Sequence, residues 1–430
     1  MRAAKWILII VGLLVALVVA GIVVLTVFVD PNRFKADIAD AVGRETGREL
    51  RLEGDIELSF FPWLALTTGQ GSLGNPPGFA AVPFVSWREA RLRVRLLPLL
   101  RGRAVLDTVK IVGADFRLLR RADGTANWEG WGPAPAASGD IAAPAGMVAG
   151  LELEDGRLQF QDDVAARLVQ LDDWQLAVGA IRPGEPIDLE TAFHATTVGL
   201  PAARLRIVGR YVPRDTATVL ENFRLDGTLA GAPLAVPEIP LELAIPSARL
   251  LTANNEIEIP AWRVQLGLFV AKGSLQATMQ QALSWSGELA LTSSALREGL
   301  AQWGIAAPAT RDPAVLGPLE LKTQWRYALA TLAAQPLSLV LDDTSLSGKL
   351  TVTLANQPLS EFELQGDRIQ LERYLPPEDA TSEPFVLPTA ALRALQVRGT
   401  LGFDAATLEQ TRMQRVRIGL LLDEQGAHAN

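Results

Sequence analysis

Polar and apolar residues alternate along many stretches of this 430-residue chain, and this pattern constrains its fold more than any other feature. Successive side chains of a strand point to opposite faces of the sheet, so strict alternation is typical of strands with one buried face. The stretches are Arg91–Leu96, Leu151–Glu154, Arg157–Gln161, Asn255–Ile259, Leu319–Lys322 and Lys349–Leu354. The pattern predicts a mainly β protein.

Turns and glycines refine this prediction. Asp-Gly pairs at 123–124, 155–156 and 226–227 predict hairpin turns, because both central residues of a type I′ turn need positive φ. A glycine also recurs between apolar residues, which predicts strands that carry a glycine and can bend there. These glycines are Gly227, Gly287, Gly348, Gly366 and Gly399. We therefore expect a strongly curved antiparallel sheet with one apolar face.

Few short helices are predicted, too few to cover the apolar face of such a sheet. Asp30 is a suitable N-cap for a helix that ends at Gly47. Ser294 is a suitable N-cap for a second helix that ends at Gly304, and residues 388–395 are compatible with a third.

The amino terminus carries a long apolar run. Trp6 to Val29 are 24 uncharged residues, which as a helix would reach about 36 Å and so cross a hydrocarbon core of about 30 Å. A cleavable signal peptide is the alternative, but its apolar region is usually shorter, and this run continues well beyond Ala20. Arg2 and Lys5 precede the run, so we expect a single-pass anchor with a cytoplasmic amino terminus.

A stretch rich in proline, alanine and glycine predicts a flexible connection between two β-rich regions. The resulting organisation is a cytoplasmic stub and transmembrane anchor (1–29), an amino-terminal domain of helix and strands (30–131), a linker (132–150) and a β-rich groove region (151–430).

Charge and composition exclude several functions. Forty basic and 48 acidic residues give a net charge of −8, which argues against a nucleic-acid partner. The chain has no cysteine and only two histidines, so it offers little for a thiol nucleophile or an imidazole metal site. Gly69–Gly74 fits a dinucleotide-binding pattern, but Pro76 and Pro77 follow where a helix is required. We expect no catalytic, cofactor or metal site, and therefore no enzyme.

Several segments carry a family likeness. They are Asp30-Pro31, Thr46–Ser59, Phe61-Pro62-Trp63, Asn75–Phe79, Leu96–Gly102, Ala122–Trp128, Ala295–Ile305 and Leu371–Pro377. In this order the chain resembles the AsmA family of bacterial envelope proteins. The resemblance implies an inner-membrane protein with a periplasmic β-sheet folded into an apolar groove, related to the chorein-type bridge-like lipid transfer proteins. It also implies a further carboxy-terminal β domain, so a sequence that stops at Asn430 is expected to be either a short member of the family or a truncated one.

Two sets of residues are candidates for lipid contact. Arg91, Arg93 and Arg95 share one face of a predicted strand, where they could bind anionic headgroups, although a solvated polar face is the better explanation of them. The apolar positions Leu350, Val352 and Leu354 are expected to line the groove.

Two functions remain open from the sequence. In the first, the protein binds or conducts phospholipid in the groove during outer-membrane biogenesis, with the inner membrane and acyl chains as partners. In the second, it is a membrane-tethered periplasmic scaffold that influences outer-membrane protein assembly through contacts with envelope proteins. Alternation alone cannot separate an open groove from a closed β core.

Overall fold

The computed structural model describes residues 30–59, 64–94, 106–129, 148–214, 216–251, 255–278, 283–354, 359–377, 396–409, 411–423 and 426–429. These residues are mainly β, with few short helices, as the alternation predicts. The predicted anchor from Trp6 to Val29, residue Arg95, most of the predicted linker and the predicted helix 388–395 lie outside the described residues. Among the helices of the described ranges, none has the length and apolar character needed to cross a membrane.

The chain divides into two compact units, residues 1–198 and 199–430, which are described separately. The first unit contains a 3-10 helix η1 (Pro31–Phe34) and the helix α2 (Lys35–Thr46). Its strands are β1 (Leu50–Leu52), β2 (Ile56–Ser59), β3 (Leu64–Thr68), β4 (Gly71–Leu73), β5 (Val85–Trp87), β6 (Glu89–Val94), β7 (Leu106–Val112), β8 (Asp115–Arg120), β9 (Val148–Asp162), β10 (Arg167–Val178) and β11 (Ile187–Thr197).

The long strand β9 joins two branches of the first unit. Residues 148–154 of β9 pair in parallel with β7, which continues through β6 and β3 to β2. Residues 157–162 pair in parallel with β8, which continues through β5 and β4 to β1. The other edge of β9 pairs with β10, and β10 pairs with β11. Strands on both sides of the predicted linker therefore belong to this unit.

Two of the three Asp-Gly pairs are not turns. Asp123-Gly124 lies in a turn as predicted, but Asp155-Gly156 lies inside β9, and residues 226–227 lie inside another strand. Asp155 has a φ of 51° and falls where β9 exchanges β7 for β8 as its neighbour. Asp155-Gly156 thus forms a bulge within β9, because a residue with positive φ is compatible with a bulge as well as with a hairpin turn.

The core of the first unit forms between the two branches and α2. Buried side chains include Leu73, Phe84 and Leu153, and Val42 of α2 packs against this cluster. The helix ends at Gly47 in the left-handed conformation, as predicted. The side chain of Asp30 accepts a hydrogen bond from the backbone N–H of residue 32 at 3.0 Å and so caps η1.

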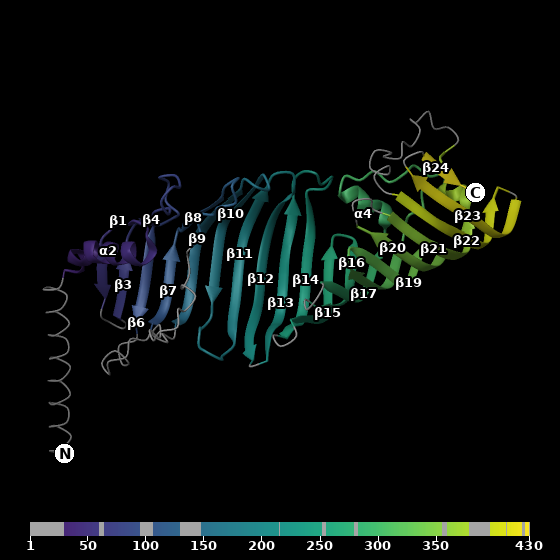
Figure 1. The fold of residues 1–430 in the computed structure, drawn as a ribbon. Helices are drawn as coiled ribbons and strands as arrows, with labels where there is room; N and C mark the ends of the chain where they lie inside the picture. The colour runs from purple at the N-terminus through teal and green to yellow at the C-terminus, as the bar shows by residue number, and fades with distance from the viewer. Residues whose placement is uncertain are drawn as a thin grey trace, which may run out of the picture. The chain divides into compact units, whose positions relative to one another are not determined.

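The second unit is a run of paired strands (Figure 1). They are β12 (Ala202–Arg214), β13 (Ala217–Ala230), β14 (Glu238–Leu251), β15 (Glu256–Leu266), β16 (Phe269–Thr278), β17 (Ser284–Ser293), β18 (Leu319–Ala328), β19 (Thr331–Leu341), β20 (Thr344–Thr353), β21 (Leu359–Gln370), β22 (Gln396–Leu408), β23 (Thr411–Asp423) and β24 (Gly426–Ala429). Each strand from β12 to β21 pairs antiparallel with the next. The pair β21–β22 is parallel, which departs from the predicted all-antiparallel sheet.

All five predicted strand glycines lie inside strands. Gly227 lies in β13, where a Cβ would come within 2.2 Å of the carbonyl oxygen of Arg204 on β12. Gly366 faces the ring of Phe403 on β22, and a Cβ there would come within 2.5 Å of it. Glycine therefore lets a neighbouring backbone or an aromatic ring approach closely, as the pattern predicts.

Two short helices, α4 (Leu296–Gln302) and α5 (Leu371–Tyr374), accompany these strands. The prediction that Ser294 caps α4 is wrong. The N-cap position of α4 is Ala295, which makes no side-chain cap, and the first helical N–H groups instead donate to the carbonyls of residues 316 and 317. Gly304 follows α4 with a φ of 70°, as expected for a residue that ends a helix.

Candidate functional site

The register of the second unit aligns apolar residues across twelve consecutive strands. Residues that pair across neighbouring strands share a face of the sheet. The aligned residues are Ile207, Leu225, Leu243, Val264, Ala271, Leu291, Leu321, Leu339, Leu346, Gly366, Phe403 and Val416. We call this row the apolar lane. At about 4.8 Å per strand, the lane follows a path of roughly 50 Å.

Apolar residues flank the lane on the same face. One row beside it contains Leu289, Thr323, Leu337, Gly348, Leu364, Leu401 and Ile418. The next contains Trp325, Ala334, Leu350, Phe362, Gly399 and Leu420. Leu364 is half-buried, whereas its neighbours Glu363 and Gln365 on the other face of β21 are exposed. The sheet therefore has one continuous apolar face and one polar face.

Two of the three predicted groove-lining residues lie on this apolar face, and the third lies beyond the end of its strand. Leu350 and Val352 are half-buried and lie on the apolar face of β20. Leu354 lies after the end of β20, where its side chain is 55% exposed and its N–H donates to the carbonyl of Ala330 at 2.6 Å. The alternation of this segment is thus present as predicted, but it stops one residue before Leu354.

The predicted headgroup-binding arginines lie in the first unit. Arg91 and Arg93 share one face of β6, opposite Leu92 and Val94, and Arg95 is outside the described residues. Arg91 forms a 2.6 Å ion pair with Glu89, and both side chains are only partly exposed. Ion pairs of this kind are typical of a solvated polar face, so the headgroup role stays a prediction.

The helix α4 and its flanking segments cover one end of the apolar face. A Cβ on Gly299 of α4 would lie 2.8 Å from the ring of Phe269 on β16. The side chain of Gln302 lies against Gly267. The backbone carbonyl of Gln302 accepts a hydrogen bond from the backbone N–H of Ala235 at 3.0 Å. Ile239 at this end is fully buried. The covered end is therefore a small closed core beside the open rows.

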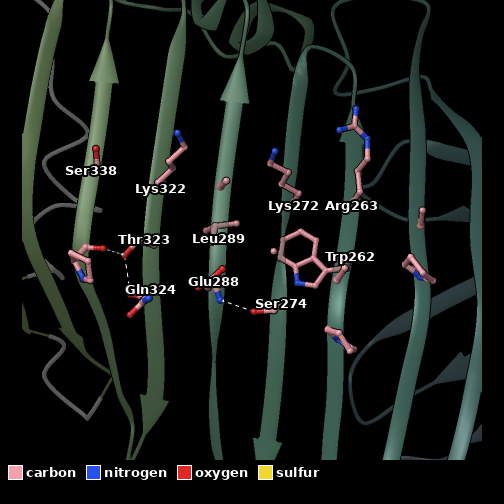
Figure 2. Close-up of a pocket in the computed structure, with 17 residues that line it drawn as sticks. Trp262, Arg263, Lys272, Ser274, Glu288, Leu289, Lys322, Thr323, Gln324 and Ser338 are labelled. Atoms are coloured by element: carbon pink, nitrogen blue, oxygen red, sulfur yellow. Dashed lines mark hydrogen bonds between the residues drawn. The ribbon is translucent and has the colours of Figure 1, made fainter.

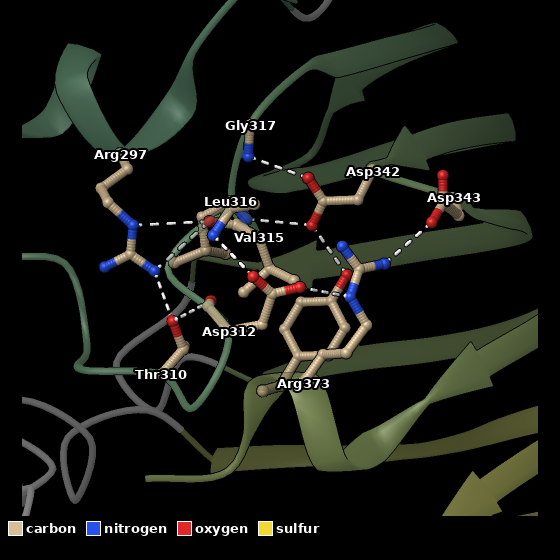
Figure 3. A network of polar contacts seen from close by, with 11 residues as sticks. Arg297, Thr310, Asp312, Val315, Leu316, Gly317, Asp342, Asp343 and Arg373 are labelled. Atoms are coloured by element: carbon tan, nitrogen blue, oxygen red, sulfur yellow. Dashed lines mark hydrogen bonds and ion pairs between the residues drawn. The ribbon is translucent and has the colours of Figure 1, made fainter. Parts of the chain in front are cut away.

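A polar network fixes this cover to the sheet (Figure 3). Arg373 of α5 donates to Asp312 at 2.7 Å and to Asp343 at 2.8 Å. Tyr374 donates its hydroxyl hydrogen to Asp342 at 2.7 Å. We call these five residues the clasp. It ties α5 and the segment after α4 to the turn between β19 and β20.

Further contacts extend the clasp to α4. Arg297 of α4 donates to the hydroxyl of Thr310 at 2.6 Å, and that hydroxyl donates to the carbonyl of Asp312 at 2.8 Å. The carboxylate of Asp342 accepts the N–H groups of Leu316 and Gly317 at 2.9 and 2.8 Å. The two family-like segments around α4 and α5 thus meet in one network.

Ionisation in the clasp follows from these contacts. The backbone N–H of Ala314 and the guanidinium of Arg373 hold the pKa of Asp312 below its usual range. Burial and the hydrogen bond to Asp342 raise the pKa of the Tyr374 hydroxyl. Both shifts favour the form that maintains the network at neutral pH, which indicates a structural role.

The sequence did not reveal the clasp. Asp342 and Asp343 form the turn between β19 and β20. Arg373 is 30 residues from its partner Asp343 and 61 residues from its partner Asp312, and Tyr374 is 32 residues from its partner Asp342. No local pattern indicates contacts over such separations.

The apolar face suits ligands that need no directional chemistry. In the described part of the chain, no three His, Cys, Asp or Glu side chains are grouped so that they could hold a metal ion. The lane instead offers half-buried leucine, isoleucine and valine side chains, which bind hydrocarbon through the hydrophobic effect. A ligand here would be recognised by its apolar length rather than by hydrogen bonds.

Comparison with known proteins places this architecture in a family. The model of the AsmA family matches residues 1–234. Protein AsmA of Escherichia coli (strain K12) is 23% identical over 372 residues, covering 85% of this chain and 47% of that protein. The AsmA family protein YhjG of the same organism is 28% identical over 129 residues, covering 27% of this chain and 19% of that protein. The chain thus spans less than half the length of either relative. No solved structure shows significant similarity to it.

Proposed function

This chain belongs to the AsmA family, and from that premise we propose that it acts in the bacterial envelope by binding or conducting phospholipid on the apolar face of its second unit. The apolar lane carries the proposal, because it aligns apolar residues across twelve strands, most of them half-buried, with Gly366 and Phe403 buried. Outer-membrane biogenesis is the process that this activity would serve.

The energetics favour acyl chains as the ligand. Each CH₂ group that leaves water contributes about 0.8 kcal/mol, so a chain lying along part of the lane would bind without polar contacts. Because strands from β12 to β23 supply the lane residue by residue, a chain could also move along it with little change in contacts. These properties suit a conduit better than a pocket.

The setting that we propose is a single-pass protein of the inner membrane. The apolar run from Trp6 to Val29 would be the anchor, with Arg2 and Lys5 on the cytoplasmic side. The bulk of the chain would then lie in the periplasm, where the inner membrane, phospholipid and envelope proteins are the available partners. No enzymatic activity is part of this proposal.

A second candidate is a scaffold that influences outer-membrane protein assembly. The clasp favours it in one respect, since it fixes a closed and rigid end to the second unit. A scaffold would use the apolar face to bind protein and would not contact lipid in the cell.

Site-specific photo-crosslinking separates these functions. The photoreactive residue p-benzoylphenylalanine would replace Leu350 or Leu364 on the apolar face, or the adjacent Lys349 or Glu363 on the polar face. The full chain would be irradiated in the envelope of a diderm host and examined by mass spectrometry. Leu350 and Lys349 lie on opposite faces of β20, and Leu364 and Glu363 lie on opposite faces of β21.

We expect phospholipid adducts at Leu350 and Leu364 and none at Lys349 or Glu363. Equal lipid labelling on both faces would contradict a selective apolar face. Protein adducts without lipid at the apolar positions would support the scaffold instead.

A further inference from the structure

A hollow of about 740 Å³ lies on the polar face of the second unit (Figure 2). Its lining includes Ala244, Arg263, Lys272, Ala290, Lys322 and Ser338, which form one cross-strand row from β14 to β19. This row is offset by one residue per strand from the row containing Leu289, so it lies on the opposite face from the apolar lane. The volume is within the range of small-molecule sites.

Bulges and prolines shape the hollow. The strand register shifts between Ile259 and Trp262 on β15 and between Ala334 and Leu337 on β19. Pro260 and Pro336 lie within these shifts and line the hollow with Pro246, and Ala244 and Ala290 add small apolar side chains. The floor is therefore largely apolar, with longer side chains around it, and the carboxylate of Glu288 is among the lining groups (Figure 2).

Three cations stand in a row above this floor. Figure 2 shows Arg263, Lys272 and Lys322 at a similar level, with Arg263 and Lys272 on the neighbouring strands β15 and β16 and Lys322 on β18. Arg263 and Lys272 are direct cross-strand neighbours, a placement in which like charges repel. Within the described part of the chain Lys272 has no ion pair, and Arg263 reaches only Gln265 at 3.4 Å. An anion between Arg263 and Lys272 would relieve this repulsion.

The third cation, Lys322, lies on β18 and is separated from the other two by β17. Lys322 is two strands from Lys272, a separation of about 10 Å, with Ala290 between them. It forms an ion pair with Glu320 beside the hollow. Figure 2 shows the two lysine side chains running parallel, so in this arrangement one small anion would contact only one of them, whereas two anionic groups joined by an apolar link over Ala290 would reach both.

We propose that this hollow binds an amphiphile with two anionic groups about 10 Å apart, such as a lipid carrying two phosphates. One phosphate would lie between Arg263 and Lys272 and the other at Lys322, with apolar atoms on the alanine and proline floor. An acidic peptide fits less well, because outside the bulges the backbone groups of β14 to β19 are paired within the sheet and offer a peptide backbone few partners.

Calorimetry with soluble probes tests the site without relying on the apolar lane. The full chain in an uncharged detergent would be titrated at low salt with α,ω-alkane bisphosphates of increasing length, with the matching alkyl monophosphates and with inorganic phosphate. We expect the best bisphosphate to bind at least about tenfold more tightly than its monophosphate, as one additional ion contact can supply.

Three variants locate the contacts. Lys322→Gln should remove the preference for bisphosphate and leave monophosphate affinity within about twofold. Lys272→Gln should weaken the binding of both the bisphosphate and the monophosphate. Lys349→Gln is the control, since Lys349 lies on β20 outside the hollow and pairs with Glu363 at 3.0 Å.

Three outcomes would overturn the proposal. They are no preference of the wild-type chain for any bisphosphate, equal effects of Lys322→Gln and Lys349→Gln, and tighter binding of an oligoglutamate peptide than of the best bisphosphate. Circular dichroism of each variant would show whether the sheet is intact, so that loss of binding is not confused with loss of fold.

Discussion

At the scale of single residues, the turn between β18 and β19 is held in an unfavourable conformation. Leu329 and Ala330 have φ values of 50° and 58° between the paired residues 328 and 331, so they form a type I′ turn. Asparagine and glycine suit that turn, whereas leucine and alanine are strained there by about 1 to 2 kcal/mol each. The Leu329 side chain is also 83% exposed.

Replacing this pair should stabilise the protein. We expect Leu329→Asn with Ala330→Gly to raise the free energy of unfolding by about 1 kcal/mol, since the left-handed strain is relieved. Urea denaturation followed by fluorescence would measure it. Leu329→Ala, which removes the exposed side chain but keeps the strain, is the control. Equal effects of both variants would show that exposure rather than backbone strain matters.

Glycine in β13 has a steric role that can be tested in the same way. In Gly227→Ala the new Cβ would lie 2.2 Å from the carbonyl oxygen of Arg204, so we expect a loss of about 1 to 3 kcal/mol. Gly209→Ala on β12 meets its nearest atom at 3.5 Å, which is ordinary contact, and should change stability by less than about 1 kcal/mol. Similar losses in both variants would contradict a steric role specific to Gly227.

At the scale of elements, α5 depends on the clasp. A helix of four residues has too few hydrogen bonds to form alone, so α5 must be held by its side chains. Arg373 and Tyr374 supply that hold through Asp312, Asp342 and Asp343. The clasp therefore determines whether the cover at the end of the apolar face stays in place.

Alkaline pH should open the clasp. The pKa of Tyr374 is raised above its unfolded value of about 10, so its contribution to stability is complete below that pH and is lost as the pH rises above it. Limited proteolysis near residues 371–377 should therefore increase above about pH 10 in the wild-type chain. Tyr374→Phe, which cannot ionise, should be cleaved more at neutral pH but show no further alkaline rise. An unchanged alkaline rise in this variant would place the responsible group elsewhere.

Elements that rest on local chemistry were predictable from the sequence. Alternation located strands such as β18 and β20, and Asp30 and Gly47 marked the ends of the first helical segment. Long-range effects were not predictable. Asp155-Gly156 has the composition of a turn, yet β9 continues through it because β7 and β8 pair with its two halves. Tertiary pairing overrode the local preference there.

At the scale of the second unit, the sequence predicted the apolar face but not its continuity. Leu350 and Val352 were identified from alternation in one strand, which says nothing about the residues beside them. The lane arises only when the register aligns Leu321, Leu339 and Leu346 from three strands. Register depends on turn lengths and bulges along the unit, and a bulge such as that before Leu337 shifts every later residue by one place.

Continuity of the lane leads to a prediction about a single charge. In Leu346→Asp a carboxylate would lie between Leu339 and Gly366, and an acyl chain crossing it would have to desolvate that charge. We expect the ratio of co-purified phospholipid to protein to fall several-fold, because each CH₂ displaced from the lane forfeits about 0.8 kcal/mol. Native mass spectrometry with lipid extraction of the full chain would measure the ratio.

The adjacent residue supplies the control for this charge. Ser347→Asp places the same carboxylate on the opposite face of β20, where the side chain is exposed, so the lipid ratio should match that of the wild-type chain. Because the two variants carry equal charge in the same strand, a difference between two folded variants reports on the face. If both variants retain lipid equally, acyl chains do not use the lane, and the scaffold becomes the better account of the apolar face.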